Sequence, residues 1–205
     1  MVALSTAFCP PIEYFAILAG YSSVFLDSSE LYNKQSWRNR CRILSGNGPL
    51  DINVPVVHGD SRLITEVRVE YTTPWEVKAE RAVASAYDSS PFFECYRDGL
   101  FAILDSHPDT LWDLNWQIIV WLCGRIGIAA PGAAADSPER VRPLGEELLD
   151  LREAIHPKRP NTVLRDLGLG KPYWQVFGDR FGFTPGLSVL DLLFNEGPDS
   201  ILWLK

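Results

Sequence analysis

The sequence has few histidines and cysteines, and none of them is grouped as in a zinc site. His58, His107 and His156 are its only histidines, and none lies within ligand spacing of any of the four cysteines. No Cys-x-x-Cys pair occurs, which argues against a zinc module and against a disulfide framework. We therefore predict no metal, interpret the cysteines as reduced and mostly structural, and expect a cytoplasmic protein, since the N-terminus also lacks a basic leader.

The chain is short of positive charge and of long apolar runs. It has 19 Lys and Arg residues and 26 Asp and Glu residues, which give a formal net charge of −7. A basic surface for nucleic acid or for anionic membranes is therefore not expected. The longest uncharged stretch, 14–26, is shorter than the roughly 20 residues of a membrane span. Any bound anion must be held locally, by a few arginines and backbone N–H groups.

Common catalytic signatures are also absent. The sequence contains no G-x-S-x-G, no Walker loop, no G-x-G-x-x-G after a strand, and no H-E-x-x-H. Apolar residues nevertheless make up 46% of the 205 residues, enough for a real hydrophobic core. Composition therefore predicts one globular domain, residues 1–205, and leaves its chemistry open.

The N-terminal third is expected to be rich in strands. A strand at 2–8, a helix after Pro10-Pro11 and a strand at 22–28 predict a βαβ opening with a parallel strand pair. Strands 35–44 and 49–58 flank Asn47-Gly48, a strong hairpin signal in which Ile43 would face Ile52. We expect a third antiparallel strand at 64–71.

The rest is expected to be mostly helical. Thr73-Pro74-Trp75-Glu76 resembles a capping box and predicts a helix to about residue 87. Further helices are expected at 90–104 and 110–125, a flexible loop at 129–143, and partial helical periodicity at 144–155. Short helices should follow at 172–181, 187–194 and 198–204. The predicted fold class is α/β, with a mixed sheet in a sheet-rich segment, residues 1–72, and a helical segment, residues 73–205.

Period-two alternation in the first hairpin strand gives one set of candidate site residues. Arg38, Arg40 and Arg42 would share one strand face, where three guanidinium groups repel one another unless something negative lies against them. That partner is either a carboxylate or phosphate ligand, or acidic side chains on neighbouring strands. Asn39 would lie on the apolar face, either satisfying backbone groups or forming part of a pocket floor.

A second set surrounds the first strand-to-helix turn. Ser5, Thr6, Glu13 and Tyr14 lie there, and in open α/β sheets ligands bind beyond the carboxyl ends of the strands. Alternatively, Glu13 only interacts favourably with the helix dipole, and Tyr14 only packs in the hydrophobic core.

Two further candidates lie in the C-terminal half. His156 follows a dense run of ionisable groups that includes Arg152, and these neighbours would tune its pKa. The alternative for His156 is a structural hydrogen bond. Ser188 and Asp191 lie one helical turn apart. They are either substrate contacts, or a helix cap and an exposed charge.

The motifs together resemble a known family. The segments STAFCPPIEYF, GYSSVFLDSS, YNKQSWRNRCRI, SAYDSSPFFECY and PGLSVLDLLFNEGP are similar, in this order, to the WbqC-like proteins. IHPK and KPYWQVFGDRFGF resemble the Bacteroidetes-type branch. Many members open with His-Gln-Pro or Gln-Pro, whereas this chain has Ser5-Thr6-Ala7-Phe8 at that place.

The resemblance implies a bacterial protein of O-antigen or surface-polysaccharide synthesis, and members have been suggested to transfer glycine to a sugar. On this hypothesis Arg38 and Arg40 hold a phosphate or carboxylate, while Asn39 and Thr6 donate hydrogen bonds. His156 or Glu13 takes a proton from the attacking amine, and Trp37 or Tyr14 stacks on a ring.

No cofactor is predicted, and a nucleotide-sugar, acyl-CoA or activated amino acid is the expected substrate. The alternative is a non-catalytic nucleotide-sugar-binding or scaffold protein of the same pathway. Its partner would be a second copy of this chain, as a homodimer, or a pathway enzyme, and exposed tryptophans would suit such an interface.

Overall fold

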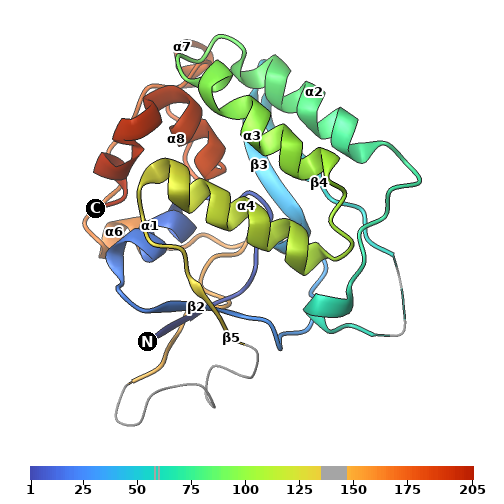
Figure 1. Ribbon diagram of the computed structural model, residues 1–205. Helices are drawn as coiled ribbons and strands as arrows, with labels where there is room; N and C mark the ends of the chain where they lie inside the picture. Colours follow the sequence, from blue (N-terminus) through green and yellow to red (C-terminus); the bar gives the residue numbers. More distant parts are fainter. Residues whose placement is uncertain (58, 60, 135–146) are drawn as a thin grey trace.

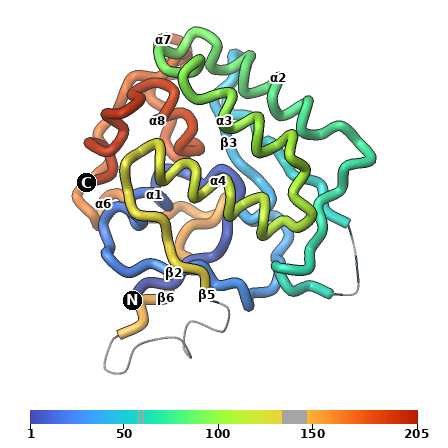
Figure 2. The backbone as a smooth tube through the Cα atoms, in the orientation of Figure 1, coloured from blue at the N-terminus to red at the C-terminus, as the bar shows by residue number. Residues whose placement is uncertain are grey.

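A four-stranded parallel sheet lies at one end of the molecule (Figures 1 and 2). The computed structural model describes residues 1–57, 59, 61–134 and 147–205. Within these, the strand order is β5-β2-β1-β6, with bounds β1 (Val2–Leu4), β2 (Val24–Asp27), β5 (Gly132–Ala134) and β6 (Leu149–Asp150). Val2 pairs with Val24 on one side and with Leu149 on the other, so β1 is a central strand.

The βαβ opening is confirmed. Helix α1 (Ile12–Gly20) connects β1 to the parallel strand β2, and its apolar residues are buried from Ile12 to Leu18. Strand β1 is shorter than the expected 2–8 because the chain turns away after Leu4. Cys9 has a left-handed φ of 40°, and the Phe8 N–H bonds to the Trp37 carbonyl outside the sheet.

The hairpin is confirmed, but its expected register is wrong. Strands β3 (Arg40–Ser45) and β4 (Gly48–Asn53) pair antiparallel, with Ile43 opposite Leu50 instead of Ile52. The two turn residues are therefore Gly46-Asn47. The Ser45 hydroxyl stabilises this turn by donating to the Gly48 carbonyl and accepting from the Asn47 N–H. Gly48 has a φ of 103°, which only glycine adopts readily.

Two expected extensions of this hairpin are not formed. Residues Trp37–Asn39 form a 3-10 turn, η1, in which the Ser36 hydroxyl accepts from the Arg38 N–H. The third strand at 64–71 is wrong as well: Ile64–Glu66 form the 3-10 turn η2, and Val69 makes only an isolated bridge with Val56. Local side-chain and turn hydrogen bonds replace the strand ladder at both places.

Helices α2 (Trp75–Tyr87), α3 (Phe93–Asp105) and α4 (Leu111–Ile126) follow, as expected. Helices α2 and α3 run beside each other next to β3, and α4 packs on α3 (Figure 1). The Thr110 hydroxyl caps α4 by accepting from the Asp113 N–H. The expected capping box at α2 is not formed, because Thr73 donates to Glu70 instead of capping the helix.

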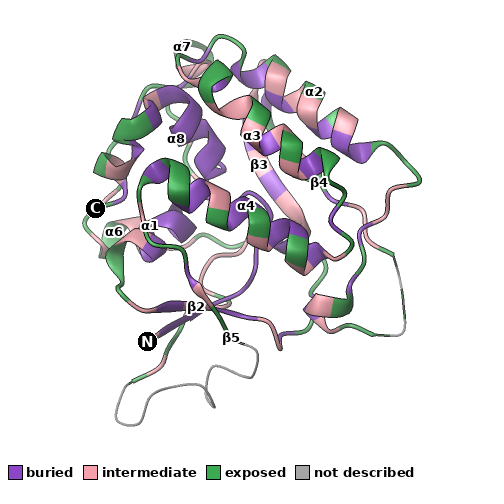
Figure 3. Cartoon of the chain, in the orientation of Figure 1, coloured by how far each residue is buried: buried purple, intermediate pink, exposed green. Residues whose placement is uncertain are grey.

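The C-terminal third adds both strands and helices. Helix α8 (Val189–Glu196) is buried along nearly its whole length (Figure 3) and confirms the expected helix at 187–194. It is preceded by the single-turn helices α6 (Val163–Asp166) and α7 (Gly178–Phe181) and followed by the 3-10 segment η3 (Gly197–Trp203). Only α7 represents the helix expected at 172–181.

Two sheet strands come from segments that were expected to be loop and helix. Strand β5 falls in the predicted loop 129–143, whose residues 135–143 lie outside the described residues. A Cβ on Gly132 would lie 2.5 Å from the Phe25 ring, so this edge strand requires glycine. Strand β6 lies in the segment 144–155, for which only partial helical periodicity was noted, and the N–H groups of Leu149 and Leu151 bond to the β1 segment.

None of the helices in the described part of the chain combines the length and apolar composition that a bilayer crossing requires.

Candidate functional site

A cleft of about 680 Å³ opens at the carboxyl ends of the parallel strands. Strand β1 leads through α1 to β2 on one side, while β6 pairs with its other side. The chain segments that follow β1 and β6 therefore run in different directions. Open α/β sheets bind their ligands at such a point of divergence. We call this the carboxyl-edge cleft; its charged lining residues are Asp27, Glu30, Arg38, Asp150, Arg152 and Glu153.

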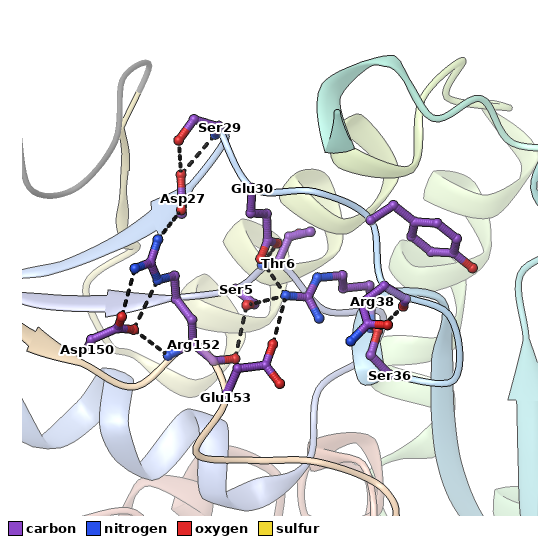
Figure 4. A network of polar contacts seen from close by, with 12 residues as sticks. Ser5, Thr6, Asp27, Ser29, Glu30, Ser36, Arg38, Asp150, Arg152 and Glu153 are labelled. Carbon is purple, nitrogen blue, oxygen red and sulfur yellow. Dashed lines mark hydrogen bonds and ion pairs between the residues drawn. The ribbon is translucent and has the colours of Figure 1, made fainter. Parts of the chain in front are cut away.

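Arg38 lies at the centre of a buried network in this cleft (Figure 4). Its Nη2 donates to Glu30 Oε2 at 2.6 Å and to Ser5 Oγ at 2.8 Å, and lies 3.4 Å from Glu153 Oε1. The 3-10 turn at Trp37–Asn39 carries Arg38 away from the hairpin and into the cleft. The Arg38 carbonyl is fixed from below by Asn115 Nδ2 of α4 at 2.8 Å.

A second network surrounds Arg152, just after β6. Its Nη1 donates to Asp27 Oδ2 at 2.6 Å, and its Nη2 donates to Asp150 Oδ2 at 2.7 Å (Figure 4). Asp27 ends β2, is only 1% exposed, and also accepts from the backbone N–H and the hydroxyl of Ser29. Arg152 thus joins the ends of β2 and β6 across β1.

The cleft is acidic in spite of its two arginines. Four carboxylates, from Asp27, Glu30, Asp150 and Glu153, face two guanidinium groups. Burial raises the pKa of Glu30, and the charge and hydrogen bond of Arg38 oppose this rise. Hydrogen bonds from Arg152 lower the pKa of Asp150. Glu153 also pairs with Arg159 at 3.4 Å, so an ionised cleft carries an excess of one negative charge and favours hydroxyl or amine groups over a free phosphate.

The predicted residues of the first turn lie beside Arg38. Ser5 Oγ donates to the Arg152 carbonyl, and the Thr6 N–H donates to Glu30 Oε1 at 3.0 Å. The buried Tyr14 hydroxyl donates to the Ser5 carbonyl at 2.8 Å, and burial raises its pKa well above the usual value. These contacts hold the β1 turn in place. Thr6 Oγ1, in contrast, is buried with no hydrogen-bond partner in the residues that the structure describes.

A small cavity of about 20 Å³, which we call the passage, shares lining residues with this cleft and with a second cleft of about 270 Å³. Arg38 and Glu153 line both the carboxyl-edge cleft and the passage, while Trp37 and His156 line both the passage and the second cleft. The second cleft also contains Glu13, and we call it the Glu13 cleft. The segment after β6 therefore lines both clefts and the passage.

Glu13 is a buried acidic group of the Glu13 cleft with one unsatisfied oxygen. It is 7% exposed, and its Oε2 has no hydrogen-bond partner in the described part of the chain. Burial raises the pKa of this carboxyl, while its own N–H in the first turn of α1 and the Asn161 side chain partly oppose the rise. Such a carboxyl keeps its proton to a higher pH than an exposed glutamate does, which suits a group that takes up and releases a proton.

His156 is held in one orientation by the chain that follows it. Its Nδ1 accepts from the Lys158 N–H at 3.1 Å. Burial and the nearby Arg159 lower its pKa, so the ring is neutral at pH 7. With Nδ1 occupied as an acceptor, the ring proton lies on Nε2, and His156 is a hydrogen-bond donor in this geometry.

The expected row of three arginines is not formed, since Arg38 points elsewhere. Arg40 and Arg42 both pair with Asp51 of β4, at 3.3 and 2.7 Å, on the hairpin surface. Arg42 also lies over the Trp37 ring, 5.6 Å from its centroid, and lines the Glu13 cleft. Asn39 Nδ2 donates to the Val54 carbonyl at 2.9 Å, which is the backbone-satisfying alternative.

Ser188 and Asp191 are not brought to these clefts. The Ser188 hydroxyl accepts from the Leu190 N–H as the cap of α8. Asp191 is 1% exposed and accepts from Tyr173 and Gln175, and burial raises its pKa. Both residues are buried at the N-terminal end of α8.

Sequence reasoning did not select Asp27, Glu30, Asp150 or Glu153, which supply the acidity of the carboxyl-edge cleft. A usable signal was present: Asp27 and Glu30 are the first acidic residues after the second strand of the βαβ unit. Carboxyl ends of parallel strands share one edge, so these residues belong beside Ser5 and Thr6. The position of Glu153 had no such signal, because β6 was not expected to be a strand.

No group of three or more His, Cys, Asp or Glu residues suited to a metal ion occurs in residues 1–57, 59, 61–134 and 147–205.

The family comparison agrees with the expected resemblance. The model of the WbqC-like protein family matches residues 6–158, which include the residues that line the passage from Thr6 to His156. Uncharacterized protein Rv1507c of Mycobacterium tuberculosis is 27% identical over 212 aligned positions, covering 94% of this chain and 91% of that protein. The expected Bacteroidetes-type branch gains no support from this relative. No solved structure gives a significant match.

Proposed function

The chain belongs to the WbqC-like protein family, and we propose that it is a transferase of surface-polysaccharide synthesis. It moves a small acyl or aminoacyl group, such as glycyl, onto the amine of a sugar precursor. The observation that carries this proposal is that the segment after β6 lines both an acidic cleft and a second cleft, in which Glu13 Oε2 is buried without a hydrogen-bond partner among the described residues. A scaffold protein needs the first of these clefts and has no use for the second.

The carboxyl-edge cleft is the site for the acceptor sugar. A hydroxyl both donates and accepts hydrogen bonds, so a surface that alternates carboxylates and guanidinium groups suits a polyhydroxy ligand. Glu153, whose side chain is 55% exposed, and the outer oxygens around Arg152 are available to such hydroxyls. The negative excess favours an amino sugar over an acidic sugar.

The Glu13 cleft is the site of the reaction. The amine nitrogen attacks the donor carbonyl carbon, and the proton that the nitrogen loses goes to the Glu13 carboxylate. His156 Nε2–H donates a hydrogen bond to the carbonyl oxygen as it becomes negative. A C–N bond forms, the bond from the carbonyl carbon to the leaving group breaks, and the leaving group departs with that electron pair.

The structure alters the roles first expected for the arginines. Arg38 already satisfies Glu30 and Ser5, so in this proposal it positions the β1 turn and Glu153 and does not clamp a phosphate. Trp37, which lines both the passage and the Glu13 cleft, is left to contact the substrate, whereas Thr6 is 1% exposed and supports the β1 turn.

A binding screen tests the acceptor site directly. The intact protein is warmed with amino sugars, free and nucleotide-linked, and with the same sugars carrying a hydroxyl in place of the amine. A ligand at 100 times its Kd adds about 2.7 kcal/mol, or roughly 5–10 °C in melting temperature for a chain of this size. We expect amino sugars to shift the melting temperature more, and Glu153→Gln to reduce that shift. Arg68→Gln, in an exposed ion pair with Asp109, is the matched control.

A transfer assay tests the chemistry. The protein is incubated with a binding amino sugar and with either an acyl-CoA or an aminoacyl-adenylate, and mass spectrometry detects the amide. Glu13→Gln should lower the rate about 10²–10⁴-fold without loss of sugar binding. If amino sugars bind but no donor yields an amide, the scaffold alternative replaces this proposal. If no amino sugar binds, the acceptor assignment is wrong.

A further inference from the structure

A third cavity, of about 240 Å³, lies on the other side of the Glu13 cleft and has a different lining. Its walls are Tyr173, Phe183 and Trp203, together with the aliphatic side chains Ile12, Leu164 and Leu169. Tyr173 meets Phe183 and Trp203 edge to face, at centroid distances of 5.3 and 6.5 Å. We call it the aromatic pocket.

The size and walls of this pocket suit one flat ring. Pockets for a whole small ligand are usually about 300–1,000 Å³, so a cavity of about 240 Å³ takes only part of a molecule. Edge-to-face aromatic walls favour a ring, which makes offset or perpendicular contacts with them.

The rim of the aromatic pocket is cationic. Lys171 and Arg165 both line it and are exposed, and Arg165 pairs only with the neighbouring Asp166, at 3.2 Å, among the described residues. In the part of the chain that the structure describes, no carboxylate forms an ion pair with Lys171. Since the protein as a whole has a formal net charge of −7, an excess of positive charge here is a local feature. It points to an anionic group attached to the ring.

The pocket is held rigid from the core side. The Tyr173 hydroxyl donates to buried Asp191 at 2.6 Å, and Gln175 donates to the same oxygen at 2.9 Å. Gln175 also bonds the Thr184 backbone in both directions, at 2.8 and 3.0 Å, which fixes the loop that carries Phe183. The buried Asp191 network therefore positions the aromatic walls before any ligand arrives.

The aromatic pocket and the Glu13 cleft share a wall. Pro185 and Gly186 line both cavities, and Ile12 of the pocket directly precedes Glu13 in α1. Gly186 has a φ of 70°, and a Cβ there would lie 3.9 Å from Glu13 Oε1. A molecule with its ring in the pocket can therefore extend past Gly186 to the Glu13 carboxyl.

From this juxtaposition we propose that the aromatic pocket binds the adenine ring of the donor, with its phosphate at Lys171 and Arg165. This inference rests on the proposed function, because it names the carrier of the transferred acyl group. Acyl groups are activated as adenylates or as coenzyme A thioesters, and both carriers join an adenine ring to phosphate. The activated carbonyl then lies in the Glu13 cleft, and AMP or the coenzyme A thiolate leaves with the electron pair of the broken bond when the amide forms.

Calorimetry with the intact protein tests this site without requiring activity. The probes are AMP, coenzyme A and geranyl phosphate, and the last keeps the phosphate but replaces the ring by a chain. We expect AMP or coenzyme A to bind. Leu164→Trp, which fills the pocket, should weaken binding at least tenfold, and Lys171→Gln should weaken it about tenfold at low salt and less at high salt. Lys78→Gln, an exposed lysine on α2, is the matched control and should change nothing.

Each outcome decides the matter. Binding of AMP alone identifies an adenylate donor, and binding of coenzyme A alone identifies a thioester donor; both support the site. The inference is overturned if neither binds, if geranyl phosphate binds in their place, or if folded Leu164→Trp protein, checked by its melting curve, binds them as tightly as before. Amide formation with a donor that does not use this pocket would retain the proposed function and reject this inference alone.

Discussion

The two adjoining clefts contain similar residue types and differ in how far these are satisfied. In the carboxyl-edge cleft each buried charge has an ion-pair partner, Glu30 with Arg38 and Asp27 with Arg152, although Arg38 Nε makes no hydrogen bond to the described residues. In the Glu13 cleft the buried carboxyl has an oxygen without a hydrogen bond from any described residue. Paired buried charges fix a geometry, whereas an unpaired one reduces stability and is retained where a proton must move. The comparison separates residues that position from residues that react.

The largest effect is expected when the Arg38–Glu30 pair is broken. Arg38→Met leaves the Glu30 carboxylate buried and unpaired, and we expect a loss of about 3–5 kcal/mol in the free energy of unfolding, measured by urea denaturation. The double variant Arg38→Met/Glu30→Gln should recover part of this loss. Equal stability of wild type and Arg38→Met would show that the pair does not hold the cleft together.

A smaller loss is expected at the second pair. Asp27→Asn keeps the side-chain shape but removes the charge that faces Arg152, which is itself partly exposed and keeps Asp150. We expect a loss of about 1–3 kcal/mol in the same denaturation experiment. A loss as large as that of Arg38→Met would mean that Arg152, and not Arg38, organises the cleft.

Removing the Glu13 charge should raise the stability of the protein, whereas the two substitutions above lower it. The folded-state pKa of Glu13 is raised by burial, so its contribution to stability is fully present below its unfolded pKa and is lost as pH rises through the folded value. Glu13→Gln, which cannot ionise, should therefore melt a few degrees higher than wild type at pH 7–8. The difference should shrink toward pH 4, and melting curves across this range measure it. A lower melting temperature at pH 8 would show that the Glu13 charge is satisfied.

The smallest effect is expected at an exposed ion pair outside both clefts. The Arg68 and Asp109 side chains are 67% and 68% exposed, and Arg68→Gln should change the free energy of unfolding by less than about 0.5 kcal/mol. This value sets the scale against which the three effects above are read in urea and thermal denaturation. A larger change would mean that surface charges contribute to all of them.

Local signals in the sequence predicted much of the fold but less of the site. The βαβ unit, the hairpin, α4 and α8 were all recoverable, because each has its own periodicity, turn or cap. Strand β6 has two residues, Leu149–Asp150, and no period of its own, so it was expected to be helical. With β6 unrecognised, Arg152 and Glu153 had no predicted place at the sheet edge.

The arginine row shows the same limit within a single segment. Alternation placed Arg38 with Arg40 and Arg42, but Ser36 caps a 3-10 turn that breaks the alternation just before the strand begins. The hydrogen bond from Asn115 of α4 to the Arg38 carbonyl then fixes the turn from 77 residues away. No window of sequence around Arg38 contains that partner.

Local sequence was enough to identify an acidic α/β chain of the WbqC-like family and to select Ser5, Glu13, Arg38 and His156 as candidates from their immediate settings. Which of these residues meet, and whether each is paired or free, followed from the tertiary structure alone. The physical reason is that secondary structure depends mainly on neighbours along the chain, whereas burial, charge pairing and pKa depend on neighbours in space. Glu30, eight residues from Arg38, and Glu153, 115 residues from it, reach the same guanidinium group.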